Sequence, residues 1–351
     1  MDNKRMRVAV YYSNHDVRIE ERPIPQIGPG EILIKVMASG ICGSDVLEWY
    51  RKPKAPLVLG HEVTGIIVAT GEGVENCQVG DAVFVSHHVP CNTCYLCLND
   101  HHTACKTLHS TNYDPGGFAE FIRVPAINVD RGLFPLPDGV SFDEGVFIEP
   151  LACCVRAQRL ANVRPGQTIL ILGGGIAGLL HLLLGQATGV GLIAITEIDP
   201  YRREIAQKLG AHAVFPADCD LSSELRKINH GRLADTVIVC AGAKEAYSQA
   251  LRSVGEGGTI LCFATTEPGI DLPLPINEFW RKEIRLLTSY GNAPRDALIA
   301  LELLTKKRLD VLPLITHRIP LEETGKGFAL VAQGGRSLKV IIKPHGSDPQ
   351  T

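Results

Sequence analysis

A glycine turn between an apolar run and a helical pattern limits the possible folds more than any other feature of this sequence. Gly173-x-Gly175-x-x-Gly178 directly follows the apolar run at residues 168–172. The spacing alone is weak evidence, but a strand before it and a helix after it are the required context. The glycines allow a tight turn and close approach of a pyrophosphate, which the free N–H groups of the helix N-terminus then face. The turn therefore predicts a dinucleotide-binding βαβ unit.

An acidic residue is expected after the second strand of such a unit, where it binds the ribose hydroxyls. Glu197 ends the next apolar run, whereas Asp199 stands before Pro200 and is interpreted as a helix N-cap. A carboxylate at position 197 repels a 2′-phosphate, although Arg202 and Arg203 lie close by in the sequence. We therefore predict that the cofactor is NAD, with NADP less favoured.

Two strand patterns divide the chain, and a length of 351 residues is enough for about two domains. Residues 1–150 hold short β-like runs split by Gly and Pro, which favours a barrel. Residues 151–289 alternate apolar runs with helical patterns, which indicates a doubly wound parallel sheet. Residues 290–351 end in a strand pattern that we expect to rejoin the first domain. The predicted fold class is α/β, with a β-barrel domain beside the doubly wound domain.

Four cysteines gather in one short loop, in the pattern Cys91-x2-Cys94-x2-Cys97-x7-Cys105. Four thiolates close a tetrahedral zinc shell, and the predicted lobe, residues 88–108, has too few apolar residues to form its own core. An iron–sulfur cluster uses other cysteine runs, and unligated thiols are the third alternative. A zinc ion with four cysteine ligands has no open position, so its role is structural. Four histidines flank this lobe and are interpreted as exposed loop residues rather than further ligands: His87, His88, His101 and His102.

A second set of residues offers an open metal site. Cys42 supplies a thiolate, His61 an imidazole, and Glu62 and Glu149 supply carboxylates. Each of these residues is weak evidence alone, because a lone Cys or His is usually core and a lone Glu is usually solvated. Together they suit zinc with a position left for water or substrate.

Composition and charge exclude several other classes of protein. The formal net charge is -3, so no strong field attracts nucleic acid or an anionic membrane. Residues 165–196 lack Asp, Glu, Lys and Arg, but their many glycines fit a buried strand, turn and helix better than a membrane span. The sequence has eleven cysteines, and its polar first residues lead directly into a strand-like run rather than a secretory signal. We therefore expect a cytoplasmic protein with reduced thiols.

Taken together, these motifs resemble the zinc-containing medium-chain alcohol and polyol dehydrogenases, the group of the sorbitol and threonine dehydrogenases. The resemblance covers nearly the whole chain. Besides the cysteine lobe and the glycine turn, it rests on Gly60-His61-Glu62-x2-Gly65-x5-Gly71-x2-Val74, Gly80-Asp81-x-Val83, Gly116-Gly117-Phe118-Ala119-Glu120 and Glu149-Pro150.

The resemblance implies a GroES-like catalytic domain built from both ends of the chain, a Rossmann domain in the middle, and an active site between them. It implies two zinc ions per chain, one catalytic and one structural. Cys42 and His61 match catalytic zinc ligands, and Glu62 and Glu149 match two glutamates that exchange roles as direct and water-mediated ligands. Positions that match cofactor contacts in the family are Ile176, Glu197, Arg202, Phe263 and Ser289.

The activity implied is hydride transfer between NAD and a secondary alcohol or polyol, or the matching ketone. Ser44 matches the hydroxyl that first accepts the substrate proton, and its alternative interpretation is a helix cap. Leu47 stands where the family often has a relay histidine, and Ser289 stands where sorbitol dehydrogenases have arginine. Expected partners are a small-molecule substrate and further copies in a homodimer or homotetramer. Two alternatives stay open: a zinc-poor quinone or enone reductase, and a non-catalytic NAD-binding relative.

Overall fold

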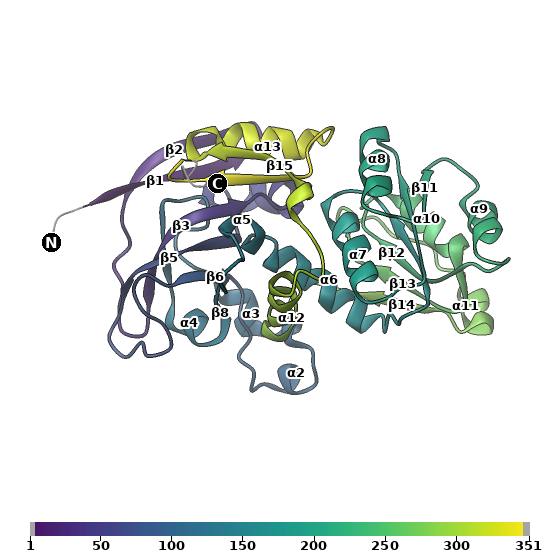
Figure 1. The fold of residues 1–351 in the computed structure, drawn as a ribbon, viewed down its shortest axis with the longest axis horizontal. Coiled ribbons are helices and arrows are strands. Elements are labelled where there is room, and N and C mark those ends of the chain that lie inside the picture. The colour runs from purple at the N-terminus through teal and green to yellow at the C-terminus, as the bar shows by residue number, and fades with distance from the viewer. Residues whose placement is uncertain (1–3, 347–351) are drawn as a thin grey trace. The chain divides into compact units, whose positions relative to one another are not determined.

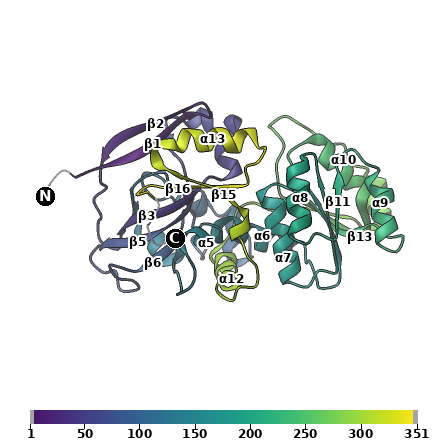
Figure 2. The same ribbon diagram turned by 45° about the horizontal axis from the view of Figure 1, so that its top comes forward.

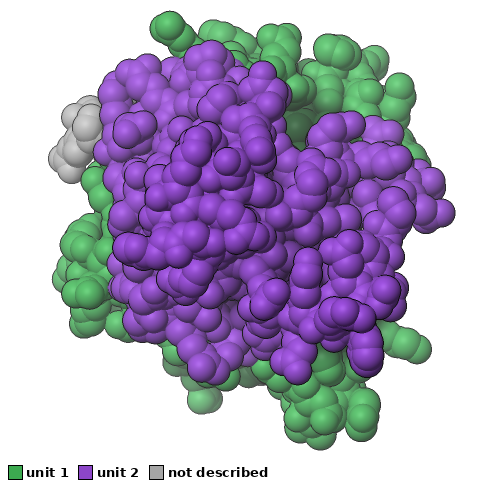
Figure 3. All heavy atoms as spheres, turned by 90° about the vertical axis from the view of Figure 1, so that its right-hand side faces the viewer, with its two compact units in different colours: residues 1–152, 292–351 green, residues 153–291 purple. Residues whose placement is uncertain are grey.

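The structure is a computed structural model that describes residues 4–346. Residues 1–3 and 347–351, at the outer ends of the first and last predicted segments, lie outside the described residues. The chain divides into two compact units (Figure 3): unit 1 is Met1–Ala152 with Asn292–Thr351, and unit 2 is Cys153–Gly291. The prediction of an α/β fold with a parallel sheet and a separate second sheet domain is confirmed.

Unit 2 contains one six-stranded sheet in the order β11-β10-β9-β12-β13-β14, and each neighbouring pair is parallel. All residues of its central strand β9 are buried, as expected for a strand covered on both faces. The strand order reverses between β9 and β12, which is where doubly wound sheets bind ligands. The strands are β9 (Thr168–Leu172), β10 (Leu192–Glu197), β11 (Ala213–Pro216), β12 (Ala234–Val239), β13 (Val254–Cys262) and β14 (Arg285–Thr288).

Helices cover both faces of the unit 2 sheet (Figures 1 and 2). Right-handed crossovers put α7 and α8 on one face and α9 and α10 on the other. The helices are α6 (Ile148–Leu160), which enters unit 2 from unit 1, α7 (Ile176–Ala187), α8 (Pro200–Lys208), α9 (Leu221–Ile228), α10 (Lys244–Ser253) and α11 (Ile276–Lys282). The charge-free stretch at 165–196 forms β9, the glycine turn, α7 and most of β10. Among the described residues, no helix has the length and apolarity needed to cross a membrane.

Unit 1 is built on two sheets. The smaller has the order β2-β1-β4, and the larger has the order β15-β16-β3-β5-β6-β8, with β7 also paired to β3. Strand β16 pairs antiparallel with β3 through Ile341 and Gly40, so the end of the chain joins a strand near its start. The strands are β1 (Arg5–Ser13), β2 (Asp16–Pro23), β3 (Ile32–Gly40), β4 (Leu57–Val58), β5 (Glu62–Thr70), β6 (Ala82–Ser86), β7 (Phe121–Val124), β8 (Leu133–Pro135), β15 (Ile315–Pro320) and β16 (Lys339–Lys343).

Short helices connect these strands. The α-helices are α1 (Glu48–Arg51), α2 (Tyr95–Leu98), α3 (Lys106–Ser110), α4 (Ala126–Gly132), α5 (Phe142–Gly145), α12 (Pro294–Thr305) and α13 (Thr324–Gln333). The 3-10 helices are η1 (Gly43–Val46), η2 (Lys52–Lys54), η3 (His102–Ala104), η4 (Leu312–Leu314) and η5 (Leu321–Glu323).

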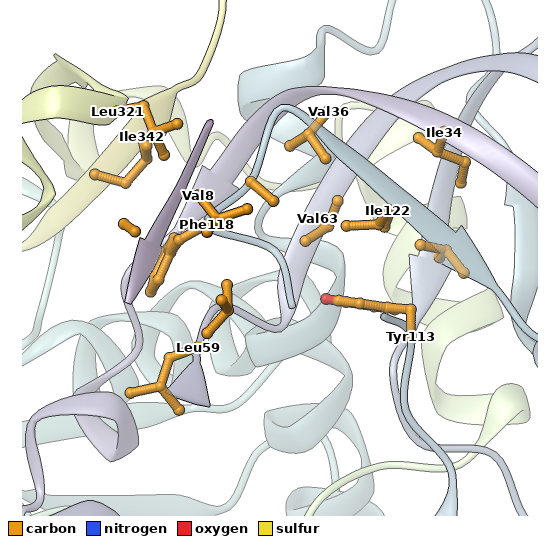
Figure 4. Close-up of a cluster of buried hydrophobic side chains, with 14 of the residues drawn as sticks. Val8, Ile34, Val36, Leu59, Val63, Tyr113, Phe118, Ile122, Leu321 and Ile342 are labelled. Carbon is orange, nitrogen blue, oxygen red and sulfur yellow. The ribbon is translucent and has the colours of Figure 1, made fainter. Parts of the chain in front are cut away.

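The core of unit 1 lies among strands from both ends of the chain (Figure 4). Val8, Ile34, Val63, Ile122 and Ile342 come from five different strands and are fully buried. Burying one such side chain contributes about 1.5–3 kcal/mol. This packing makes a firm support for the ends of β3 and β5, where the candidate site begins.

Candidate active site

Strand pairing brings the first candidate metal ligands together. Cys42 lies shortly after β3, His61 directly precedes β5, Glu62 is the first residue of β5, and Gly40 of β3 lies opposite Glu62. One ligand atom from each of Cys42, His61 and Glu62 lies within 4.8 Å of the other two. A Cβ atom at position 40 would lie 1.9 Å from Glu62 Oε2, so only glycine leaves room for this carboxylate. We call Cys42, His61 and Glu62 the mixed-ligand cluster.

Asp45 orients two members of this cluster. Its Oδ2 accepts a hydrogen bond from Cys42 N at 3.1 Å, and its Oδ1 lies 3.3 Å from His61 Nδ1 and 3.4 Å from Arg51 Nη2. Because Nδ1 faces Asp45, Nε2 is the histidine nitrogen left for a metal. Burial alone would raise the pKa of Asp45, but His61 and Arg51 lower it below its usual value. Burial alone would lower the pKa of His61, but Asp45 and Cys42 raise it well above its usual value.

The two candidate glutamates have different partners. Lys339 Nζ donates to Glu62 at 2.8 Å and 2.6 Å from its two carboxylate oxygens, and neither side chain is exposed to solvent. Glu149, in the first turn of α6, accepts a hydrogen bond from Asn292 Nδ2 at 3.1 Å and is not a member of the mixed-ligand cluster. Burial alone would lower the pKa of Lys339, but the charges of Glu62, Cys42 and Glu149 raise it. Glu149 therefore acts on this region electrostatically.

Ser44 contacts the candidate thiolate ligand directly. Its hydroxyl donates to Cys42 Sγ at 3.4 Å, and Arg51 Nη2 donates to Ser44 Oγ at 3.2 Å. The side chain that caps η1 belongs to Cys42, which accepts from Ser44 N, so the alternative interpretation of Ser44 as the helix cap is wrong. Leu47 ends η1 and offers no side-chain donor or acceptor.

The four cysteines of the lobe form a compact tetrad. Neighbouring Sγ atoms of Cys91, Cys94, Cys97 and Cys105 are 3.6–3.9 Å apart. A tetrahedral zinc ion with Zn–S bonds of about 2.3 Å gives S–S separations of about 3.8 Å. Backbone N–H groups of Thr93 and Cys94 lower the pKa of Cys91 to about 5. The donor set and its spacing therefore fit zinc.

His87 and His88 are half-buried, contrary to the expectation that they are exposed, and His87 packs against His61 of the mixed-ligand cluster. The rings of His87 and His61 are 4.9 Å apart, and those of His87 and His88 are 4.0 Å apart. His88 Nδ1 lies 2.6 Å from Thr111 O, and burial lowers the pKa of His88 to about 4. Both residues directly follow β6, whose residues 83–86 are buried, so they begin next to the core of unit 1 and not on the exposed part of the loop.

The glycine turn of unit 2 has the form of a phosphate cradle. Gly173 has a φ of +108°, which favours glycine, and a Cβ atom at Gly178 would lie 1.9 Å from Gly173 O. Glu197 is buried beside the turn, where its Oε2 accepts from Gly174 N at 2.7 Å and its Oε1 accepts from Asp199 N at 2.9 Å. Asp199 caps α8, as the sequence indicates, so the two acidic residues have separate roles.

The remaining predicted cofactor residues lie around the same edge of the sheet. Ile176 is the first residue of α7, and Phe263 and Ser289 directly follow β13 and β14. The carboxyl ends of parallel strands share one edge, which is the ligand edge of this fold. Ser289 Oγ is buried without a hydrogen-bond partner, and Arg202 Nη1 approaches within 3.7 Å of a Cβ built at Gly175. An open glycine cradle and an unsatisfied hydroxyl fit a bound dinucleotide.

Comparison with known proteins assigns the family. Residues 28–138 match the model for the alcohol dehydrogenase GroES-like domain, and residues 177–306 match the model for zinc-binding dehydrogenases. The chain is 32% identical over 349 residues to sorbitol dehydrogenase of Ovis aries, covering 97% of this chain and 96% of that protein. The chain belongs to the zinc-containing medium-chain alcohol and polyol dehydrogenases. The resemblance predicted from the motifs is confirmed, and the protein is an oxidoreductase of this family.

Solved structures agree with this assignment over the whole dehydrogenase fold. A zinc-binding dehydrogenase from Sinorhizobium meliloti 1021 bound to NADP has a TM-score of 0.87 and 27% identity, with 97% of this chain and 100% of that chain covered. Galactitol-1-phosphate dehydrogenase from Escherichia coli has a TM-score of 0.86 and 28% identity, with the same coverage. The predicted pairing of a GroES-like domain with a Rossmann domain in one dehydrogenase is confirmed.

Proposed function

We propose that this dehydrogenase oxidises a secondary alcohol of the polyol class with NAD and reduces the matching ketone. The observation that carries the proposal is the mixed-ligand cluster of Cys42, His61 and Glu62. One thiolate, one imidazole and one carboxylate leave a coordination position for substrate. Zinc held there supplies a Lewis acid that favours loss of the substrate's hydroxyl proton. Sorbitol and galactitol-1-phosphate, named in two of the relatives, support the polyol class.

In our proposal, Glu62 and Glu149 have different roles at this site. Glu62 offers the third ligand atom of the cluster, and Glu149 is the second carboxylate that would be available to a bound metal, directly or through water. Asp45 fixes the imidazole of His61 through Nδ1, and Ser44 takes the first proton from the substrate. Arg51, which donates to Ser44 Oγ, holds this hydroxyl in place beside the thiolate.

Unit 2 supplies the cofactor site in this proposal. Gly173, Gly175 and Gly178 receive the pyrophosphate, and Glu197 and Arg202 receive the adenosine ribose. Ile176, Phe263 and Ser289 complete the cofactor contacts. Preference for NAD is supported by the buried carboxylate of Glu197, which repels a 2′-phosphate, although one structural relative holds NADP. The cysteine tetrad is proposed to hold a second, structural zinc ion.

The proposal also includes the cellular location and the oligomeric state of the protein. Two thiolate-containing metal sites need reduced cysteines, which supports a cytoplasmic location. We propose a homodimer or homotetramer as the assembly.

A substrate screen with metal analysis tests the function. Reduction of NAD and of NADP is followed spectrophotometrically against a panel of secondary alcohols, polyols and polyol phosphates, and zinc is quantified in the same sample. We expect turnover of at least one polyol with NAD and two zinc ions per chain. One zinc ion per chain with quinone reduction would instead favour the zinc-poor reductase, and cofactor binding without turnover would favour a non-catalytic relative.

A further inference from the structure

A buried lysine from the far end of the chain holds one of the candidate metal ligands. Lys339 is the first residue of β16, and its ammonium group contacts both carboxylate oxygens of Glu62. Both side chains have 0% exposure. Glu62 is also confined on its other side, where only the absence of a Cβ atom at Gly40 leaves room for it. The Glu62 carboxylate therefore has a single position, set by β3 and β16 together.

We propose that Lys339 is a positioning residue of the mixed-ligand cluster, which holds Glu62 and balances the charge of the metal site. This inference rests on the proposed function, because it requires a divalent metal at Cys42, His61 and Glu62. Neither the sequence motifs nor the ligand set includes Lys339. A lysine is almost never fully buried unless it is paired. The burial of Lys339 therefore depends on its ion pair with Glu62.

The charges around the site account for a cation at this position. Cys42 as thiolate, Glu62 and Glu149 are anionic, whereas Asp45 is already paired with Arg51. With Lys339 included, the thiolate and two carboxylates leave two negative charges, which a zinc ion neutralises. Without Lys339, the protein would hold three anionic groups around the metal, two of them buried. The ammonium group thus limits how strongly Glu62 attracts the metal.

Two opposite effects are expected when the ammonium group is removed. The metal-free protein becomes less stable, because removing one partner of a buried ion pair leaves an uncompensated buried charge. Zinc binding becomes tighter, because the metal then meets a carboxylate with no competing cation. A residue that only supported the fold would instead loosen the site and weaken zinc binding.

The experiment compares Lys339→Met with the matched control Lys343→Met. Lys343 lies on the same strand, is also buried, and donates to Asp143 Oδ1 at 2.8 Å, away from the cluster. Unfolding temperatures are measured with and without zinc, and release of the more weakly held zinc ion is followed by chelator competition. For Lys339→Met we expect a lower unfolding temperature without zinc and about tenfold tighter zinc retention, because the ammonium group no longer repels the metal ion. For Lys343→Met we expect equal losses of unfolding temperature with and without zinc and unchanged zinc release.

A second variant keeps the test decisive if Lys339→Met does not fold without metal. The double variant Lys339→Met with Glu62→Gln removes both charges and should recover the unfolding temperature of the metal-free protein. If the double variant fails to fold while Glu62→Gln alone folds, the proposal is overturned. Equal or easier release of zinc from Lys339→Met than from Lys343→Met also overturns it. A wild-type protein that holds zinc only at the cysteine tetrad would contradict the proposed function itself. Zinc analysis of the wild-type protein therefore distinguishes failure of the proposed function from failure of the Lys339 proposal.

Discussion

Asp45 shows how a single fully buried residue prepares two metal ligands at once. Its carboxylate accepts from the backbone of Cys42 through Oδ2, and its Oδ1 faces both Nδ1 of His61 and Nη2 of Arg51. Residues that orient metal ligands in this way are nearly as important for the site as the ligands themselves. The importance of Asp45 follows from these contacts and not from any direct reach to substrate.

We predict that Asp45→Asn weakens metal binding without unfolding the protein. Asparagine keeps the size of the side chain but removes the charge that raises the pKa of His61 and fixes its ring. Outer partners of metal ligands typically contribute about 10–100-fold to metal affinity or activity. Zinc content after dialysis against a chelator and kcat/KM should both fall, while the circular dichroism spectrum stays unchanged. Full zinc retention in this variant would contradict the role assigned to Asp45.

The choice between the two dinucleotides is a second question at the residue scale. We predict that Glu197→Ala raises the KM or Kd for NAD much more than that for NADP, because the alanine variant loses the carboxylate that we propose to bind the ribose hydroxyls and to repel a 2′-phosphate. Measuring Kd for both cofactors by fluorescence titration checks this. Equal losses for both cofactors would assign the preference to another residue, such as Arg202.

Among the elements, the cysteine lobe is the one that we propose to depend most on a bound metal. Its buried cluster consists of Cys97, Cys105 and Leu108 with Cys91 and Cys94 packed against it, so the sulfur atoms stand in for a hydrophobic core. We predict that Cys94→Ser lowers the unfolding temperature by several degrees or makes the protein insoluble. Structural zinc sites contribute on the order of 10 kcal/mol to folding. Differential scanning calorimetry and zinc analysis measure the effect, and an unchanged unfolding temperature would exclude a structural metal.

Elements whose pattern lies within a short, continuous stretch of sequence could be predicted from the sequence alone. The apolar run of β9, its glycine turn and the start of α7 are continuous in the chain, and their geometry follows from residue types alone. The cysteine tetrad is local in the same way. The compact arrangement of Cys42 with His61 and Glu62 could be proposed from their residue types, but their closeness depends on the register between β3 and β5.

Residues that reach the site from distant elements could not be predicted. Lys339 stands in an apolar run near the end of the sequence, where a lysine is ordinarily read as solvated, and Asn292 stands in a loop. Their roles depend on where β16 and the segment before α12 meet β3, β5 and α6, and pairing between distant segments leaves no local sequence signal. The burial of His87 could not be predicted for a related reason, because its ring packs against His61, which precedes a different strand.

At the scale of the whole molecule, each unit contains buried titratable groups that couple its stability to pH. In unit 1, burial would raise the pKa of Asp143, but hydrogen bonds from Lys343 and Arg318 lower it. The stability that this carboxylate contributes is lost only as pH falls below its ordinary pKa of 3.8 toward the lowered value. In unit 2, His181 is buried against Gln158 and Phe263, and burial lowers its pKa to about 3. Mild acid should therefore destabilise unit 2 through His181, as it destabilises unit 1 through His88, whose pKa burial lowers to about 4.

We predict that His181→Gln makes unit 2 less sensitive to mild acid. The unfolded chain binds a proton at His181 below about pH 6.5, whereas the folded chain does so only below about 3, so acid favours unfolding across this window. The slope is about 1.4 kcal/mol per pH unit, which reaches about 2 kcal/mol at pH 5. Urea unfolding at pH 7 and pH 5, with hydrogen exchange of the α7 amides as the readout for unit 2, measures the difference. The exposed His15→Gln serves as the control, and a wild-type pH dependence in His181→Gln would contradict the prediction.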